Sequence, residues 1–132
     1  MFPKQMFDKN SFKNVNENGK IIGFSFDMKI QYYRGITLSI IRNIEVEVDE
    51  KSYPRDSILF TVNNETFTLD EMRTVISNRW LFGQYARVTV LCENGLSQGQ
   101  HHIKCIQTIA PSYMPFQIVG PGELDFEIQE DM

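Results

Sequence analysis

The sequence predicts an all-β fold, either a β-sandwich or a small jelly-roll-like barrel, with one short helix. Three observations favour this class. Apolar and polar residues alternate along several segments, turn residues recur about every ten positions, and a single short stretch has helical spacing. Six or seven short strands in a chain of 132 residues suit one domain with one core.

Residues 20–32 carry the clearest strand pattern. Apolar side chains occupy every second position, namely Ile22, Phe24, Phe26, Met28, Ile30 and Tyr32. Because successive side chains point to opposite faces of a strand, this spacing predicts one buried face. Further strands are expected where alternating or apolar runs lie between turn residues, at 36–41, 43–49, 57–62, 66–68, 84–92 and 100–110.

Local motifs predict a turn and the short helix. Asn63-Asn64 favours a tight hairpin, since asparagine tolerates positive φ. The run Thr68-Leu69-Asp70-Glu71 fits a capping box, in which the Thr hydroxyl and the Glu carboxylate each bind a free backbone amide. Apolar residues then repeat at three- and four-residue spacing, which predicts a helix over about 70–77.

The chain divides into three parts by pattern. Residues 1–19 are polar without a sustained period and are predicted to form an N-terminal arm. Residues 20–116 hold the predicted β-sandwich domain. Residues 117–132 are acidic with spaced apolar positions, which fits either a C-terminal tail or an edge strand.

Charge and composition argue against several classes of partner. The net charge is −4 and no stretch concentrates Lys and Arg, so neither nucleic acid nor an anionic membrane surface is an expected partner. No apolar run has the length of a membrane span, and the first residues lack a signal-peptide core. We therefore expect a cytoplasmic protein whose Cys92 and Cys105 are reduced and buried, although a disulfide between them is geometrically possible.

The candidates for chemistry are weak. His101 and His102 are neighbours on a predicted strand, so their rings point to opposite faces and cannot share one metal ion. Neither cysteine has a positioned base or a ligand-spaced partner, and no glycine-rich phosphate loop is present. Carboxylates are plentiful, but nothing marks a glycosidase pair among them. We predict no catalytic residue, metal ligand or cofactor on this chain.

Three loops look like interface segments. Aromatic residues make up 12% of the chain, and the loops at 31–35, 80–83 and 111–116 combine them with Arg or Met between Gly and Pro. Such side chains anchor protein interfaces. The predicted interface or substrate-proximal residues are Tyr32, Tyr33, Arg34, Trp80, Phe82, Tyr113 and Met114. For Trp80, a place in the core is equally favoured.

The same loops resemble a known family, the β subunit of bacterial C-glycoside deglycosidases. The similar runs are YYRGITLS (32–39), LDEM (69–72), WLFG (80–83), GLSQGQH (95–101) and SYMP (112–115). The likeness extends from about Phe24 to Phe116 and leaves out residues 1–19 and the tail from Gln117. Ala110-Pro111 departs from the family pattern, which has a polar or basic residue before the last run.

The resemblance implies a role in a heteromeric lyase. In that family an α subunit similar to sugar isomerases, with a barrel fold, binds a divalent metal, as a rule manganese. It cleaves the carbon–carbon bond between a 3-oxo sugar and an aromatic aglycone such as a flavonoid. The 3-oxo group acidifies the neighbouring proton, whose base-assisted loss expels the aglycone carbon. This chain would be the accessory subunit of a higher hetero-oligomer, stabilising the α subunit and helping to shape its pocket.

Two other classes of function stay open. One is a free-standing carbohydrate- or aromatic-ligand-binding β-sandwich module that uses the same Tyr and Trp side chains for stacking. The other is an autonomous small hydrolase. An accessory subunit expressed alone should be poorly soluble or oligomeric, a binding module should be a monomer that binds sugar, and a hydrolase should turn over substrate by itself.

Overall fold

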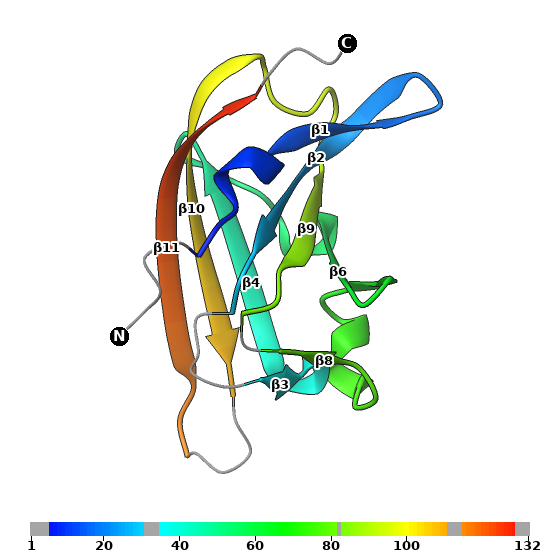
Figure 1. Ribbon diagram of the computed structural model, residues 1–132, viewed down its shortest axis with the longest axis vertical. Coiled ribbons are helices and arrows are strands. Elements are labelled where there is room, and N and C mark those ends of the chain that lie inside the picture. The colour runs from blue at the N-terminus through cyan, green and yellow to red at the C-terminus, as the bar shows by residue number, and fades with distance from the viewer. Residues whose placement is uncertain (1–5, 31–34, 82, 111–114, 129–132) are drawn as a thin grey trace.

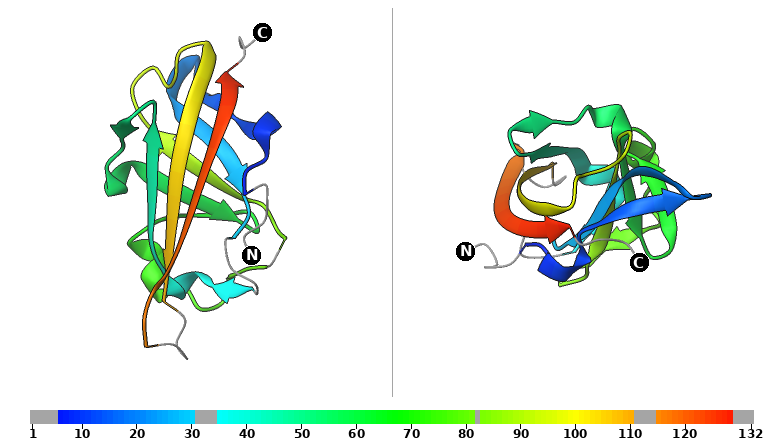
Figure 2. Two further views of the ribbon diagram at one scale, coloured as in Figure 1. Left: turned by 90° about the vertical axis from the view of Figure 1, so that its left-hand side faces the viewer. Right: turned by 90° about the horizontal axis from the view of Figure 1, so that it is seen from above.

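A computed structural model of the chain shows two antiparallel sheets packed face to face (Figure 1), which confirms the predicted all-β class. The structure describes residues 6–30, 35–81, 83–110 and 115–128. The strand order is β1-β2-β9-β6-β7 in the larger sheet and β11-β10-β4-β5 in the smaller one, and a short β3–β8 pair lies at one end. Figure 2 shows the two layers from the side and from above.

The strands follow one another along the chain with short connections. Their bounds are β1 Lys13–Glu17, β2 Lys20–Met28, β3 Ile36–Thr37, β4 Ile41–Val48, β5 Lys51–Ser52, β6 Ile58–Val62, β7 Glu65–Thr68, β8 Arg79–Trp80, β9 Ala86–Leu91, β10 Gly99–Ile109 and β11 Ile118–Ile128. Short 3-10 turns cover Lys9–Ser11, Leu38–Ile40, Arg55–Ser57 and Glu71–Thr74. No helix in the described part of the chain is long and apolar enough to cross a membrane.

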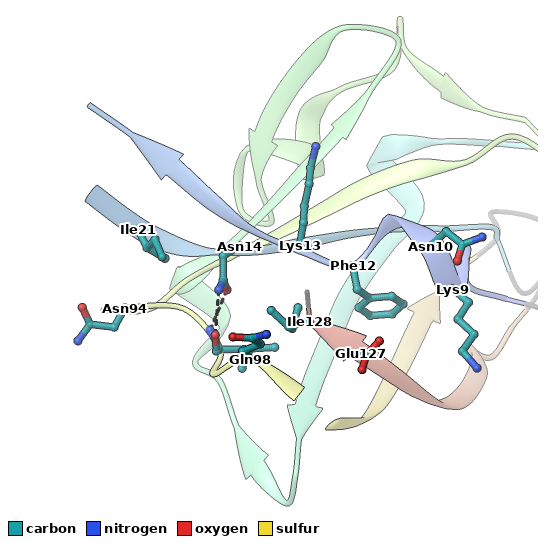
Figure 3. Close-up of a pocket in the computed structure, with 11 residues that line it drawn as sticks. Lys9, Asn10, Phe12, Lys13, Asn14, Ile21, Asn94, Gln98, Glu127 and Ile128 are labelled. Atoms are coloured by element: carbon teal, nitrogen blue, oxygen red, sulfur yellow. Dashed lines mark hydrogen bonds between the residues drawn. The ribbon is translucent and has the colours of Figure 1, made fainter. Parts of the chain in front are cut away.

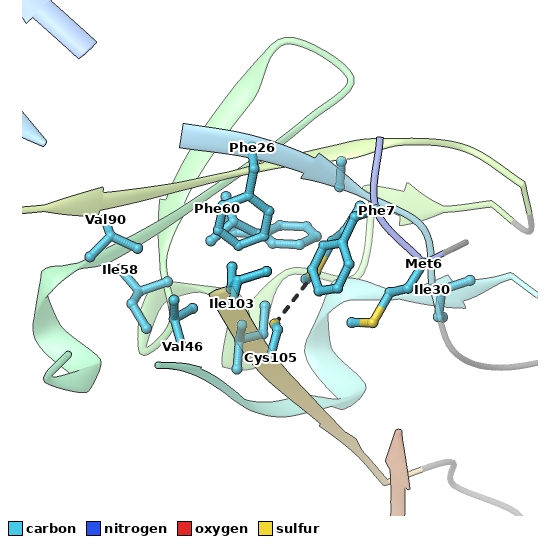
Figure 4. Close-up of a cluster of buried hydrophobic side chains, with 14 of the residues drawn as sticks. Met6, Phe7, Phe26, Ile30, Val46, Ile58, Phe60, Val90, Ile103 and Cys105 are labelled. Atoms are coloured by element: carbon cyan, nitrogen blue, oxygen red, sulfur yellow. Dashed lines mark hydrogen bonds between the residues drawn. The ribbon is translucent and has the colours of Figure 1, made fainter. Parts of the chain in front are cut away.

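The core lies between the two sheets and follows from the alternating pattern of the strands. Phe26 of β2 and Phe60 of β6 meet Ile103 and Cys105 of β10 there, all with no exposed surface (Figure 4). Phe12 completes the contact: its ring stacks 5.1 Å from Phe26 and 4.1 Å from Phe126, so one residue touches both sheets.

The described N-terminal segment, which begins at Met6, contributes to this core, so the prediction of a separate arm over 1–19 is wrong for the part described. Phe7 is buried and forms a β-bridge with Met28. The β1 strand pairs antiparallel with β2, from Lys13 opposite Ser25 to Glu17 opposite Lys20. Because β1 is an exposed edge strand with a bulge between Val15 and Asn16, its sequence lacks the alternation that marks a half-buried strand.

The C-terminal segment is an edge strand, one of the two predicted alternatives. β11 pairs with β10 over eleven residues, from Gly99 opposite Ile128 to Ile109 opposite Ile118. Phe126 and Ile128 point into the core. Pro121 is tolerated because β11 is at the sheet edge.

The expected short helix is a 3-10 turn, Glu71–Thr74. The capping box that starts it is confirmed: the Thr68 amide donates to the Glu71 carboxylate at 2.8 Å, and the Glu71 amide donates to the Thr68 hydroxyl at 3.1 Å. The turn ends at once because Val75 is extended and its carbonyl accepts a hydrogen bond from the Ser39 amide. That contact also interrupts the strand expected at 36–41, where β3 gives way to a 3-10 turn.

Two smaller predictions concern turns and thiols. Asn63 and Asn64 adopt positive φ of 54° and 65° between β6 and β7, as predicted for this hairpin. Cys92 and Cys105 are free thiols. Cys105 lies in β10 of the smaller sheet and Cys92 follows β9 of the larger one, so the two thiols belong to different sheets.

Replacement of Gly23 by Ala should destabilise the fold strongly. A Cβ atom at Gly23 would overlap the carbonyl oxygen of Val90 in the paired strand β9, and neither backbone can retreat without breaking the ladder. We expect Gly23→Ala to cost about 3 kcal/mol and to lower the melting temperature by on the order of 10 °C, measured by circular dichroism.

Gly122→Ala is the matched control in a second strand. Its added Cβ would meet the sulfur of Met6, the far end of a flexible side chain that can rotate away. The loss should stay below about 1 kcal/mol. Equal losses in the two variants would contradict the backbone-overlap explanation.

Candidate functional site

The segments that flank the three aromatic loops meet at the end of the sandwich that carries β3 and β8 (Figure 1). Gly35 lies against the backbone of Trp80 and Leu81, where a Cβ atom would approach the Trp80 carbonyl oxygen to 3.3 Å. The Ala110 amide donates to the Ile40 carbonyl at 2.8 Å. Three segments far apart in sequence therefore share one end, which we call the loop end.

Trp80 forms the floor of the loop end. Only 1% of the residue is exposed, and its ring packs edge-on against Phe60 at 5.1 Å between centroids. Its indole N–H donates to the Gln84 carbonyl at 2.8 Å, which satisfies its one polar atom. The structure thus places Trp80 in the core, one of the two alternatives predicted for this side chain.

The remaining predicted contact residues are Tyr32, Tyr33, Arg34, Phe82, Tyr113 and Met114, and all six lie outside the described residues. The described residues beside them are informative, because several are apolar and exposed. Leu81 is 54% exposed, Phe116 is 63% exposed and Ile76 is 76% exposed. Sequence reasoning missed these three, although Leu81 and Phe116 fall within the loops it had selected.

The exposed apolar residues are not spread evenly over the domain. Tyr85 and Val119 also belong to segments at the loop end, beside β8 and at the start of β11. Leu91, at the far end of β9, is the sixth large apolar side chain that the described part exposes. Single exposed apolar residues are ordinary on a protein surface, but five at one end mark that end as a contact surface.

The opposite end holds the turn whose sequence is GLSQGQH. Leu96 is 8% exposed, and its amide and carbonyl both bind the side-chain amide of Asn14 at 2.8 Å. Gly95 has a φ of 59° and packs so closely on Asn14 that a Cβ atom would overlap it. The turn is thereby locked to β1.

The two histidines that follow this turn point to opposite faces of β10, as predicted. His101 donates from Nδ1 to Asp49 at 2.6 Å and from Nε2 to the Ser97 carbonyl at 2.7 Å. Its ring also stacks on Phe126 at 5.6 Å. On the exposed face, His102 lies 2.6 Å from Asp125 and 2.8 Å from Glu123.

Sequence reasoning missed the carboxylate partners of both rings. These partners are distant along the chain, since Asp49 comes from the β4–β5 turn and Glu123 and Asp125 come from β11. The antiparallel register, which sets His102 opposite Asp125, brings them together. Each ring bridges separate segments, and no group of three or more metal-ligating side chains within the described residues is placed to hold a metal ion.

Both histidines have a raised pKa. Burial disfavours a charge on His101, but the hydrogen bonds to Asp49 and Ser97 outweigh it and raise the pKa of the ring. The hydrogen bond to Glu123, followed by the one to Asp125, raises the pKa of His102. The hydrogen bond from His101 lowers the pKa of Asp49. Because each ring has acceptors at both nitrogens, only the imidazolium satisfies all four contacts.

Stability should therefore depend on pH in two directions. The histidine contribution is complete below the ordinary pKa of 6.5 and is lost as the pH rises through their raised values. The Asp49 contribution is complete above the ordinary pKa of 3.8 and is lost as the pH falls through its lowered value. We expect the melting temperature to be highest between these limits.

Substitutions distinguish the contributions of His101 and His102 to this pH dependence. His101→Gln should most strongly flatten the neutral-pH side of the curve of melting temperature against pH. The wild-type His101 side chain is 8% exposed, whereas that of His102 is 47% exposed and better screened by solvent. His102→Gln is the matched control and should flatten it less. A profile that stays unchanged in both variants would contradict this assignment.

Comparison with known proteins agrees with the sequence motifs. Residues 2–113 match the family model described as C-glycoside deglycosidase beta subunit. A beta subunit of that name from Eubacterium cellulosolvens is 39% identical over 113 residues, which cover 85% of this chain and 77% of the relative. Another from Microbacterium trichothecenolyticum is 25% identical over 80 residues, covering 61% of this chain and 57% of the relative.

The family match also corrects the extent of the likeness. It begins at residue 2, so residues 2–19 of the segment 1–19, which we expected to lie outside the likeness, fall within it. This agrees with the packing of Phe7 and Phe12 into the core. The chain belongs to the C-glycoside deglycosidase beta subunit family.

Proposed function

We propose that this chain is the accessory subunit of a heteromeric C-glycoside deglycosidase, a lyase that cleaves the carbon–carbon bond between a 3-oxo sugar and an aromatic aglycone. Membership of a family named as a beta subunit supports a partner subunit. The observation that carries the proposal further is the loop end, where apolar side chains are exposed beside the loops that resemble the family.

The proposal assigns metal binding and proton transfer to the partner, an α subunit similar to sugar isomerases that holds a divalent metal such as manganese. The described residues of this chain do not fit a metal site, because they contain no suitable group of three or more ligands. The carboxylates around His101 and His102 are already paired with these rings. We therefore derive no catalytic step through this chain.

Its contribution would be a rigid apolar surface. The buried Trp80 is paired with Ile36 at the start of β3, which fixes the backbone that leads into Leu81. Burying a Leu, Ile or Phe side chain against a partner stabilises a complex by about 1.5–3 kcal/mol. The proposed contacts also include Tyr32, Tyr33, Arg34, Phe82, Tyr113 and Met114, which the sequence places in or beside the same loops.

The proposal includes a reducing location in the cytoplasm. Both cysteines are free thiols, and burial raises the pKa of Cys105 far above its ordinary value, so this thiol stays protonated and unreactive.

Co-expression tests the accessory role. Expressed alone, the full chain should be poorly soluble or self-associate through the loop end, because apolar side chains there remain in water. Co-expressed with an α subunit similar to sugar isomerases, the chain should co-purify and elute as one complex on size-exclusion chromatography. A stable monomer that cleaves a deglycosylation substrate without a partner would overturn the proposal.

Charge substitutions test the position of the interface. Leu81→Asp and Phe116→Asp should each reduce complex formation at least tenfold, because a carboxylate would be buried in an apolar contact. Leu91→Asp is the matched control, since this side chain is exposed at the other end of β9. The melting temperatures of all three chains should stay close to that of the wild type, and pull-down with the partner measures the difference.

Two results would contradict the assignment of the loop end. One is full complex formation by both loop-end variants, and the other is a loss of equal size in Leu91→Asp.

A further inference from the structure

A second site lies away from the loop end, in the seam between the two sheets (Figure 3). Among the described strands, β1 pairs only with β2 and β11 only with β10, so these two edges pass each other without a shared ladder. The gap between them and the 94–98 turn forms an open pocket of about 700 Å³. That volume is within the range of about 300–1,000 Å³ typical of small-molecule sites.

The floor of the pocket is apolar and preformed. Phe12, Leu96 and Ile128 line it, and each is less than a tenth exposed. Phe12 is held in place by its stacking on Phe126 at 4.1 Å. An apolar ligand face would therefore meet a surface that needs no rearrangement.

One wall of the pocket is fixed by a paired contact. The Asn14 side chain accepts a hydrogen bond from the Leu96 amide and donates one to the Leu96 carbonyl, each at 2.8 Å. Figure 3 shows these two bonds beside Gln98. They hold the turn at a set distance from β1, and they occupy the polar atoms of Asn14.

The rim, in contrast, carries polar side chains without partners. Within the described part of the chain, no hydrogen bond or ion pair is formed by the side chains of Asn10, Asn94, Gln98, Lys9 or Glu127, all of which line the pocket. The amides offer both donors and acceptors, the ammonium group donates and the carboxylate accepts. Gln98 and Glu127 lie on either side of Ile128 in Figure 3.

We propose that this pocket binds an uncharged polyhydroxylated ring of the pyranose class. A pyranose has an apolar face of C–H groups, which suits the floor, and an edge of hydroxyl groups that both donate and accept, which suits the mixed rim. A simple anion fits less well because the carboxylate of Glu127 lines the same pocket as Lys9 and Lys13. The site shares no residue with the loop end and stands independently of docking there.

Methyl-labelled protein provides the test. The full chain, in the form in which it is soluble, is labelled at its isoleucine δ1 methyl groups and titrated with methyl β-D-glucopyranoside. The methyl signals of Ile128 and Ile21, which line the pocket, should shift and saturate with a Kd in the millimolar range. The signal of Ile76, at the loop end, should not move.

Rim variants assign the effect to the pocket. Gln98→Ala and Glu127→Ala should each weaken binding about fivefold, as expected for the loss of one hydrogen bond. Gln100→Ala is the matched control, because Gln100 is also exposed but does not line the pocket. All three positions are exposed, so each variant should keep the fold. Isoleucine methyl signals away from the pocket, such as that of Ile76, should match those of the wild type and so verify this.

Several outcomes would overturn the proposal. They are a lack of shift at both Ile21 and Ile128, equal binding in the rim variants and the wild type, and equal weakening in Gln100→Ala. A titration with inorganic phosphate completes the test, since saturable shifts with phosphate and none with the glucoside would show an anion site instead.

Discussion

The structure depends on the contact between the apolar faces of its two sheets, and Phe12 is the residue that joins them at the open seam. Its ring packs on Phe26 from one sheet and on Phe126 from the other. Removal of such a side chain from water contributes about 1.5–3 kcal/mol. Because β1 and β11 share no hydrogen bonds among the described strands, side-chain packing holds this side of the sandwich together.

This constraint leaves the two ends of the domain with different characters. At the loop end, the backbone is held by the β3–β8 pair over the buried Trp80, while apolar side chains remain exposed. At the other end, polar contacts tie the turn before β10 to neighbouring segments through Asn14 and Asp49. An apolar end suits permanent contact with another protein, whereas a polar end suits solvent and hydroxylated ligands.

The paired histidines show how a sheet uses polar side chains to tie distant segments together. Each ring sits between two acceptors, and these hydrogen bonds raise the pKa of both rings. Such pairs are worth most where solvent is excluded, which favours His101 over His102 as a structural contact. Both ring nitrogens of each histidine are thereby engaged by acceptors.

The sequence by itself determined what depends on near neighbours along the chain. Period-two alternation located β2, paired asparagines located the hairpin after β6, and Thr68 with Glu71 located a capping box, because each reflects local backbone geometry. Short motifs also identified the family. Tertiary structure decided the rest: whether Trp80 is buried, which carboxylates reach His101 and His102, and how β1 joins the sheet. These depend on strand register and on packing between distant segments, which no local pattern specifies.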